Sequence, residues 1–224
     1  MTPIKDQQKM GITVSICLFC FYKKEKHVLL IKNQKEPFKN AMMLPYRVMS
    51  ANESIEKVTK SILKENIGNN KVYIEQLNAF AKQYRHPFER IIDISFYGLI
   101  NIEKHNIKLN KNKLADFFSI DNKPELAFDH DEIIEFALKR VKRRMKYRPI
   151  GINLLPDKFT MDELEELYAS FMDKKFDKRN FRRRILDMDF VKLVTKVQRS
   201  HVGRKTHLYQ FDEKKYKNYS NIGF

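Results

Sequence analysis

Residues Phe159–Phe190 read FTMDELEELYASFMDKKFDKRNFRRRILDMDF, which is the pattern of two consecutive amphipathic helices. The first helix is predicted to begin at Thr160, because Glu163 three residues later completes a capping box. Asp177 is a suitable N-cap for a second helix that ends near Met188. The first helix has one apolar face, formed by Leu164, Leu167, Tyr168 and Phe171.

The second helix carries five Lys or Arg residues among the seven from Lys178 to Arg184. Because a helix advances by about 100° per residue, Phe181 and Ile185 share a buried face and the arginines point away from it. Because clustered like charges repel one another, this arrangement costs stability unless an anion is present. The planar arginine side chain can also donate two hydrogen bonds at once to a phosphate or to a guanine edge. We therefore predict that this helix contacts DNA, rather than forming only a solvated surface.

Beyond the helices, FVKLVTKV (190–197) and HLYQF (207–211) read as strands around the basic loop QRSHVGRKT. Helix, helix, strand, basic loop and strand is the order of a winged helix-turn-helix. We expect residues 179–183 to enter the major groove and the remaining basic residues to contact phosphates. The predicted DNA-binding residues are Lys178, Arg179, Asn180, Arg182, Arg183, Arg184, His201, Arg204 and Lys205.

The first half of the chain mixes strands and helices. Pro149, Gly151 and Pro156 mark a boundary, so we predict an α/β domain over 1–148 and a DNA-binding domain over 149–224. The predicted strands are 11–22, 27–33, 72–81 and 91–101, and the predicted helices are 52–66 and 131–147.

The bulk composition of the 224 residues agrees with a polyanionic partner, since the net charge is +16 and the pI is near 9.7. No stretch reaches the roughly 18 apolar residues of a membrane span, and we expect a soluble, cytoplasmic protein. Cys17 and Cys20 form a C-x-x-C without further ligands at metal-binding spacing, so buried, reduced cysteines are favoured over a metal or redox site.

The segment Pro149–Phe190, with the later LYQF, resembles the C-terminal winged helix of the Nudix-related transcriptional regulators. The motifs LLP-x-x-FT, LY and DKRNFRR carry this resemblance, and YIEQLNAF (73–80) and FDHDEII (128–134) extend it to the first half. The resemblance implies an α/β/α Nudix sandwich joined to a winged helix. It also implies a homodimer that senses a sugar such as L-arabinose or a nucleotide sugar such as ADP-ribose.

A working Nudix box, G-x5-E-x7-R-E-U-x-E-E-x-G, holds Mg²⁺ through its carboxylates. When the box is aligned with this sequence, its first Gly falls on Arg47, its Arg falls on Ser61 and its last Gly falls on Gly68. Two metal-binding Glu positions hold Ile62 and Asn66, which share one helix face. The sequence therefore predicts no useful hydrolysis and neither a metal nor a cofactor. The loss of these carboxylates also slightly favours a free sugar as the effector.

The loop LPYRV places two bulky residues where the family usually has glycines, which narrows the mouth of the ligand site. Candidate ligand-binding residues are Tyr46, Arg47, Glu53, Glu65, Arg85 and Arg90. Two other functions remain open. One is a Nudix hydrolase with altered metal ligands and an accessory nucleic-acid domain. The other is an RNA-binding module, although the aromatic stacking motifs of single-strand binders are missing.

Overall fold

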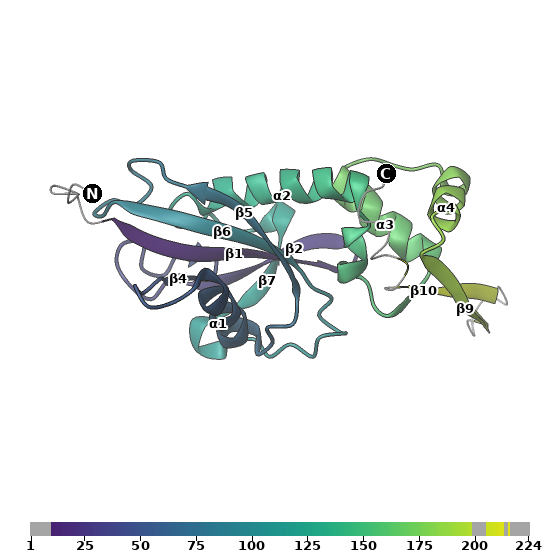
Figure 1. Ribbon diagram of the computed structural model, residues 1–224, viewed down its shortest axis with the longest axis horizontal. Helices are drawn as coiled ribbons and strands as arrows, with labels where there is room; N and C mark the ends of the chain where they lie inside the picture. Colours follow the sequence, from purple (N-terminus) through teal and green to yellow (C-terminus); the bar gives the residue numbers. More distant parts are fainter. Residues whose placement is uncertain (1–9, 199–204, 213–214, 216–224) are drawn as a thin grey trace, which may run out of the picture. The chain divides into compact units, whose positions relative to one another are not determined.

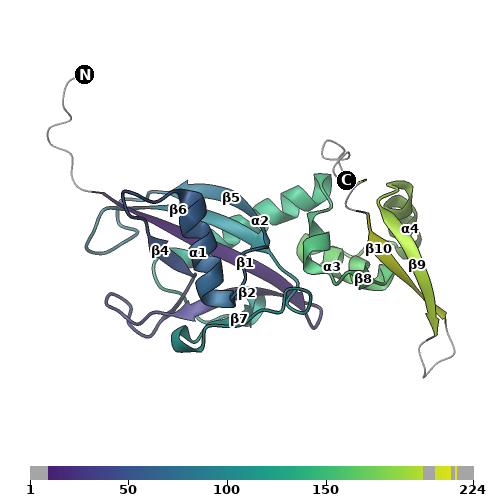
Figure 2. The same cartoon turned by 60° about the horizontal axis from the view of Figure 1, so that its bottom comes forward.

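The computed structural model describes residues 10–198, 205–212 and 215 (Figures 1 and 2). The strands are β1 (Gly11–Tyr22), β2 (Glu25–Lys32), β3 (Met42–Met43), β4 (Tyr46–Val48), β5 (Tyr73–Phe80), β6 (Ile91–Leu99), β7 (Asp116–Ser119), β8 (Lys158–Phe159), β9 (Val191–Gln198) and β10 (Lys205–Phe211). The α-helices are α1 (Ile55–Ile67), α2 (His130–Tyr147), α3 (Met161–Met172) and α4 (Lys178–Asp187). Short 3-10 helices are η1 (Lys111–Lys113), η2 (Ile120–Asn122) and η3 (Ile150–Leu154).

The first half of the chain forms a sheet between two helices. The strand order is β3-β2-β1-β6-β5, with β4 added to β1 and β7 to β2. Helix α1 and the first half of α2 lie on opposite faces of this sheet (Figures 1 and 2). Residues 13–20 of β1 are all buried because both faces of the strand are covered. The predicted α/β/α sandwich is therefore confirmed.

Capping residues fix where helix α1 begins and where it ends. The Ser54 side chain accepts a hydrogen bond from the Lys57 N–H at 3.2 Å, which caps the N-terminus. Gly68 adopts a left-handed φ of 69° and donates its N–H to the Lys64 carbonyl at 3.0 Å. The helix begins three residues after the predicted start at 52, because Ser54 supplies the cap.

The hairpin between β1 and β2 is tighter than the sequence suggested. Strand β2 begins at Glu25, two residues before the predicted start, and the turn consists of Lys23 and Lys24 alone. Both residues have positive φ values, 49° and 68°, as the two-residue turn that matches strand twist requires. Lysines replace the usual Asn-Gly pair, so the turn carried no recognisable signal. The short strands β3, β4, β7 and β8 also went unpredicted.

The chain divides into two compact units. Unit 1 consists of the residues up to 18, 28–98 and 107–137, and unit 2 consists of 19–27, 99–106 and the residues from 138 onwards. Inside unit 2, Lys24 pairs with Glu166 of α3 at 2.8 Å and Lys26 pairs with Asp173 at 2.9 Å. These ion pairs hold the hairpin residues against α3, which a boundary drawn in sequence alone does not anticipate.

Unit 2 contains α3, α4 and a sheet in the order β8-β10-β9. The capping box is present, since Thr160 Oγ1 accepts from the Glu163 N–H at 3.1 Å and Glu163 Oε2 accepts from the Thr160 N–H at 2.7 Å. The predicted apolar face of α3 is buried. Helix, helix, strand and strand follow in the order of a winged helix.

Two further expectations can be compared with the fold. Cys17 and Cys20 are buried and unbridged, as predicted, and burial raises the pKa of the Cys17 thiol. Within the ranges that the structure describes, no helix combines the length and the apolar content that crossing a bilayer requires.

Candidate nucleic-acid interface and ligand site

Helix α4 is anchored on α3 by one apolar face. Phe181 and Ile185 are 7% and 2% exposed, and the Phe181 ring lies 5.7 Å from the Tyr168 ring of α3. Asp177 caps the helix by accepting the Asn180 N–H at 2.9 Å. The basic residues of α4 are consequently directed to its flanks and to its outer face.

The cations of α4 fall into two groups. Arg182 lies 3.1 Å from the Asp162 carboxylate of α3, and Lys178 lies 3.8 Å from the same carboxylate. Arg183 donates to the Asn180 side-chain oxygen at 3.1 Å. Arg179 takes part in no hydrogen bond or ion pair within the described part of the chain. Arg179, Arg183 and Arg184 are therefore the cations of α4 that belong to no ion pair among the described residues.

The wing, which is the hairpin of β9 and β10, belongs to the same domain as α4. Strands β9 and β10 are antiparallel, with Lys205 opposite Gln198 and a register shift between Leu208 and Tyr209. Predicted residues His201 and Arg204 lie outside the described residues, and Lys205 is placed as the first residue of β10.

In the region aligned with the Nudix box, the charged side chains pair with one another. The Arg47 guanidinium donates to Glu53 and to Ser61 Oγ, both at 2.8 Å. Ser61 stands where the box has its arginine, so Arg47 supplies a guanidinium that the helix lacks. Glu65 pairs with Lys113 at 2.7 Å. Both remaining carboxylates of the box are thus neutralised by cations of the chain.

The other two metal positions lie in the protein interior. Ile62 and Asn66 are each 1% exposed. The Asn66 amide donates to the Ile62 carbonyl at 2.8 Å, while its side-chain oxygen is buried without a partner among the described residues. No cluster of three or more metal-ligating side chains occurs in the described ranges. An apolar side chain, an uncharged amide and two neutralised carboxylates do not fit a Mg²⁺ ion, which needs several charged oxygen ligands.

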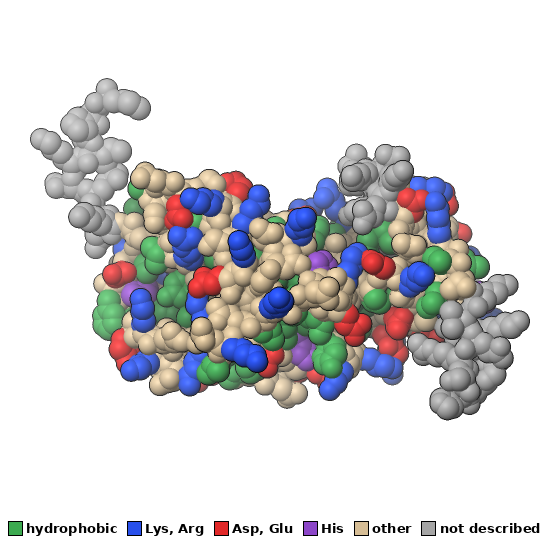
Figure 3. All heavy atoms as spheres, turned by 90° about the horizontal axis from the view of Figure 1, so that it is seen from below, with side chains coloured by type: hydrophobic (Ala, Val, Ile, Leu, Met, Phe, Trp, Pro, Cys, Tyr) green, Lys and Arg blue, Asp and Glu red, His purple; other side chains and the backbone are tan. Residues whose placement is uncertain are grey.

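The surface around α1 has no dominant basic patch. Figure 3 views the molecule from the side on which Figure 1 draws α1, and there Lys and Arg side chains are scattered, with fewer Asp and Glu side chains among them. This distribution contrasts with the five cations on the short helix α4.

Comparisons with known proteins identify the C-terminal domain and show what the whole chain resembles. Residues 151–211 match the family model of the NrtR DNA-binding winged helix domain. The chain is 24% identical over 206 residues to the ADPR responsive transcriptional repressor NtrR of Acinetobacter baylyi, covering 89% of this chain and 81% of that protein. Residues 151–211 therefore match the NrtR winged-helix family, and the chain as a whole is similar to a Nudix-related transcriptional regulator.

Other matches extend over one or both domains of this chain. The crystal structure of Shewanella oneidensis NrtR complexed with a 27mer DNA is 24% identical, with a TM-score of 0.82 over 92% of this chain and 95% of that one. The ADP-ribose pyrophosphatase of Methanocaldococcus jannaschii is 31% identical over 113 residues, which cover 50% of this chain and 66% of that protein.

The predicted ligand-binding residues do not gather in one place. Tyr46 and Arg47 line a hollow of about 210 Å³ together with Lys32 and Lys113. Arg85 lines a different hollow, of about 470 Å³. The lining of the second hollow also includes the aromatic residues Phe38, Tyr84 and Phe128.

Several predicted ligand residues already have partners in the protein. Arg85 holds Asp129 through two hydrogen bonds, at 3.0 and 2.7 Å, and the two side chains are only 5% and 11% exposed. Arg90 donates to the Lys82 carbonyl at 2.9 Å. Burial raises the pKa of the Tyr46 hydroxyl, so this residue is neutral at physiological pH.

Sequence reasoning missed three residues of unit 1. Lys113 lies 48 positions after Glu65 in the chain, and no motif links the two. Burial lowers the pKa of His130 to about 3, and the neutral ring accepts the Leu44 N–H at 3.0 Å. Burial raises the pKa of Asp93, although hydroxyls including Ser15 at 2.6 Å donate to its carboxylate. None of these pairings has a sequence signal, because the partners lie far apart along the chain.

Proposed function

We propose that this regulator binds a DNA operator through α4 and the β9–β10 wing, and that its Nudix-like domain binds a nucleotide sugar of the ADP-ribose class. The observation that carries the DNA-binding part is the orientation of α4. Its apolar face is packed on α3, while Arg179 and Arg183 are exposed and are not paired with any carboxylate that the structure describes. An exposed helix of this kind is the element that enters the major groove in helix-turn-helix proteins.

The effector class is proposed from the relatives. The Acinetobacter relative is described as responsive to ADPR, and the Methanocaldococcus relative as an ADP-ribose pyrophosphatase. These relatives favour a nucleotide sugar over the free sugar that the lost carboxylates had slightly favoured. Lys32, Arg47 and Lys113 line the smaller hollow. Arg47 and Lys113 are paired with Glu53 and Glu65, so Lys32, which belongs to no ion pair in the described ranges, is the cation proposed to attract a diphosphate without a metal ion.

The two hollows of unit 1 are linked by a row of aromatic rings. The Tyr46 ring lies 6.4 Å from His130, which lies 5.4 Å from Phe128, and Phe128 lies 5.0 Å from Phe38. A nucleotide sugar is long enough to use both hollows, with its diphosphate beside Arg47 and its base among the rings of the larger hollow. Exposed aromatic faces are suitable partners for a base.

Binding without turnover is the second part of the proposal. The buried Ile62 and Asn66 provide no charge for a metal ion, and Glu53 and Glu65 are engaged by Arg47 and Lys113. A diphosphate would therefore be held in place but not hydrolysed. Steady-state assays of ADP-ribose with Mg²⁺ or Mn²⁺ should show no turnover above a protein-free control.

A hydrolase is the competing function, and the 31% identity to an ADP-ribose pyrophosphatase is what favours it. Turnover that depends on Mg²⁺ or Mn²⁺ and survives further purification would establish the competing function. The same assay therefore separates a sensor from an enzyme.

A homodimer completes the proposed mechanism, because two winged helices related by a two-fold axis would read two operator half-sites. Effector binding would change the population of the arrangement that fits both half-sites. Analytical ultracentrifugation with and without operator DNA tests the dimer. A monomer that binds one half-site with full affinity would contradict this part.

Fluorescence anisotropy tests the central proposal. A labelled duplex from upstream of the gene is compared with a scrambled duplex at several salt concentrations, with and without ADP-ribose or L-arabinose. We expect selective binding that ADP-ribose shifts and L-arabinose leaves unchanged. Equal, steeply salt-dependent binding to both duplexes would show that α4 is only an electrostatic surface. Competition between duplex DNA and RNA addresses the RNA-binding alternative.

A further inference from the structure

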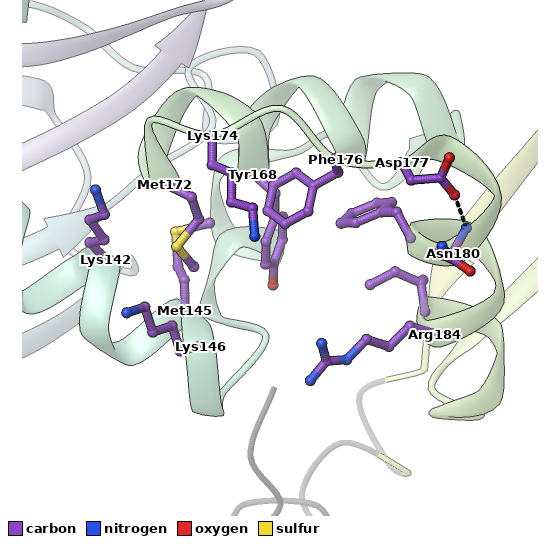
Figure 4. A pocket seen from close by; sticks show the side chains of 12 residues that line it. Lys142, Met145, Lys146, Tyr168, Met172, Lys174, Phe176, Asp177, Asn180 and Arg184 are labelled. Atoms are coloured by element: carbon purple, nitrogen blue, oxygen red, sulfur yellow. Dashed lines mark hydrogen bonds between the residues drawn. The ribbon is translucent and has the colours of Figure 1, made fainter.

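A third hollow, also of ligand size, lies within the winged-helix unit (Figure 4). Its volume is about 410 Å³, inside the range of roughly 300–1,000 Å³ that is usual for small-molecule sites. All the residues around it come from the second half of α2, from α3, from α4 and from the segment between α3 and α4. The hollow is therefore separate from the Nudix-like site.

The apolar part of this hollow is made by helix positions spaced three or four residues apart. Such positions share a helix face, so each helix directs a pair of side chains towards the same space. Met145 of α2, Tyr168 of α3 and Ile185 of α4 are 0%, 3% and 2% exposed, so they provide a fixed wall rather than a surface patch. Phe176 and Met172 complete the apolar side (Figure 4).

Cations stand around the apolar wall. Lys142, Lys146, Lys174 and Arg184 line the hollow, against one carboxylate, that of Asp177. Asp177 is already used as the cap of α4, where it accepts the Asn180 N–H. Lys142 shares the Asp173 carboxylate with another lysine. In the ranges that the structure describes, neither Lys146 nor Arg184 belongs to an ion pair.

We propose that this hollow binds a small amphipathic anion, namely an aromatic or aliphatic body that carries a carboxylate, phosphate or sulfonate. The apolar wall removes the body from water, and the surrounding cations attract the charged group. Charge complementarity selects this class, because a neutral ligand would leave Lys146 and Arg184 without a counter-charge.

The site has a direct route to DNA binding. Asn180 and Arg184 belong to both the hollow and α4, so a bound anion neutralises one cation of this helix and adds negative charge beside it. DNA affinity should therefore fall when the hollow is occupied. This consequence rests on the proposed function, whereas binding of the anion does not.

The test uses the full chain and two dyes that differ mainly in charge. 1-Anilinonaphthalene-8-sulfonate carries a sulfonate, and N-phenyl-1-naphthylamine has the same aromatic rings without it. Fluorescence titration should show binding of the sulfonate at least about fivefold tighter than that of the neutral dye, as expected for one or two partly exposed ion pairs. Equal affinity for the two dyes would overturn the proposal.

Matched charge reversals locate the binding. Lys174→Glu removes a cation of the hollow, and Lys175→Glu makes the same change on an exposed neighbour that does not line it. We expect Lys174→Glu, and likewise Lys146→Glu, to weaken sulfonate binding by about fivefold. Lys175→Glu should leave it unchanged, and circular dichroism should confirm that the variants are folded. An equal loss in Lys174→Glu and Lys175→Glu would overturn the proposal.

Anisotropy with the operator duplex then measures the consequence, with and without saturating sulfonate dye. We expect weaker DNA binding in the wild type and a smaller change in Lys174→Glu. If DNA binding is unselective but the dyes bind as expected, the proposed function is contradicted and the anion site is supported. If DNA binding is selective but the dyes do not bind as expected, the anion site is contradicted and the proposed function is supported.

Discussion

Arg47 in the Nudix-like domain and Arg183 on α4 are both accessible arginines, yet their surroundings differ. Arg47 is held by Glu53 and Ser61 at 2.8 Å each, and nearby Lys113 is paired with Glu65. Among the described residues, Arg183 is hydrogen-bonded to the uncharged Asn180 side chain and belongs to no ion pair. The two regions contain the same residue types, but Arg47 and Lys113 are paired with carboxylates, whereas Arg183 is not.

The charge of Arg47 therefore serves the fold, whereas the charge of Arg183 is available to a binding partner. Removing a cation from the first region should affect folding, because a carboxylate then loses its counter-charge. Removing one from the outer face of α4 should affect DNA binding and leave folding nearly unchanged. Each region can therefore be probed with one measurement of stability and one of binding.

The largest effect is expected for Arg85→Ala. The variant leaves the Asp129 carboxylate, 11% exposed, without its two hydrogen bonds, which should lower the free energy of unfolding by about 3–5 kcal/mol. Urea denaturation of both proteins measures the difference. Arg90→Ala, which removes a contact to a backbone carbonyl at the surface, is the control and should change stability by less than about 0.5 kcal/mol. Equal stability of Arg85→Ala and the wild type would contradict the structural role of this arginine.

Arg183→Ala should have the next largest effect, on DNA selectivity rather than on folding. Loss of a base-reading arginine is expected to cost about 1–3 kcal/mol of discrimination between operator and scrambled duplex, measured by anisotropy. Arg182→Ala is the comparison, because Arg182 is already paired with Asp162 and should cost less. Unchanged discrimination in Arg183→Ala would refute the assignment of α4 as the recognition helix.

Lys205→Ala tests the wing and should give a smaller, uniform effect. Contacts to phosphate carry no sequence information, so affinity for operator and scrambled duplex should fall by a similar factor. The slope of log affinity against log salt should become shallower by about 1. A loss confined to the operator would instead place Lys205 on a base edge.

The smallest effect concerns the pH dependence of stability at Glu53. Partial burial acts to raise the pKa of this carboxyl, but the Ser50 N–H and the Arg47 guanidinium outweigh it, and the pKa lies below its ordinary value of 4.5. Such a group stabilises the fold above 4.5, and the contribution disappears as the pH falls through the lowered value. Glu53→Gln should therefore be less stable than the wild type at neutral pH, and the difference should shrink steadily as the pH is lowered below 4.5. A difference that persists in acid would show that charge is not its cause.

Much of the fold follows from local pattern. The capping box at Thr160, the Asp177 cap and the apolar face of α3 are short-range features, and all appear as predicted. The turn after β1 was predicted two residues too long, and the strands of two to four residues were missed because too few residues carry their pattern. The candidate ligand residues were chosen by type and position, and the chain distributes them over two hollows.

The sequence by itself determined the helices of the winged domain, the basic character of α4 and the loss of charged ligands at positions 62 and 66. Each of these depends on residues within a few turns of one another, where spacing fixes which side chains share a face. The tertiary structure alone decided which charges are available to a partner. Lys113 reaches Glu65, Arg85 reaches Asp129 and Arg182 reaches Asp162 across distant parts of the chain. Ion pairs of this kind depend on distances of a few ångströms between elements, which only packing sets.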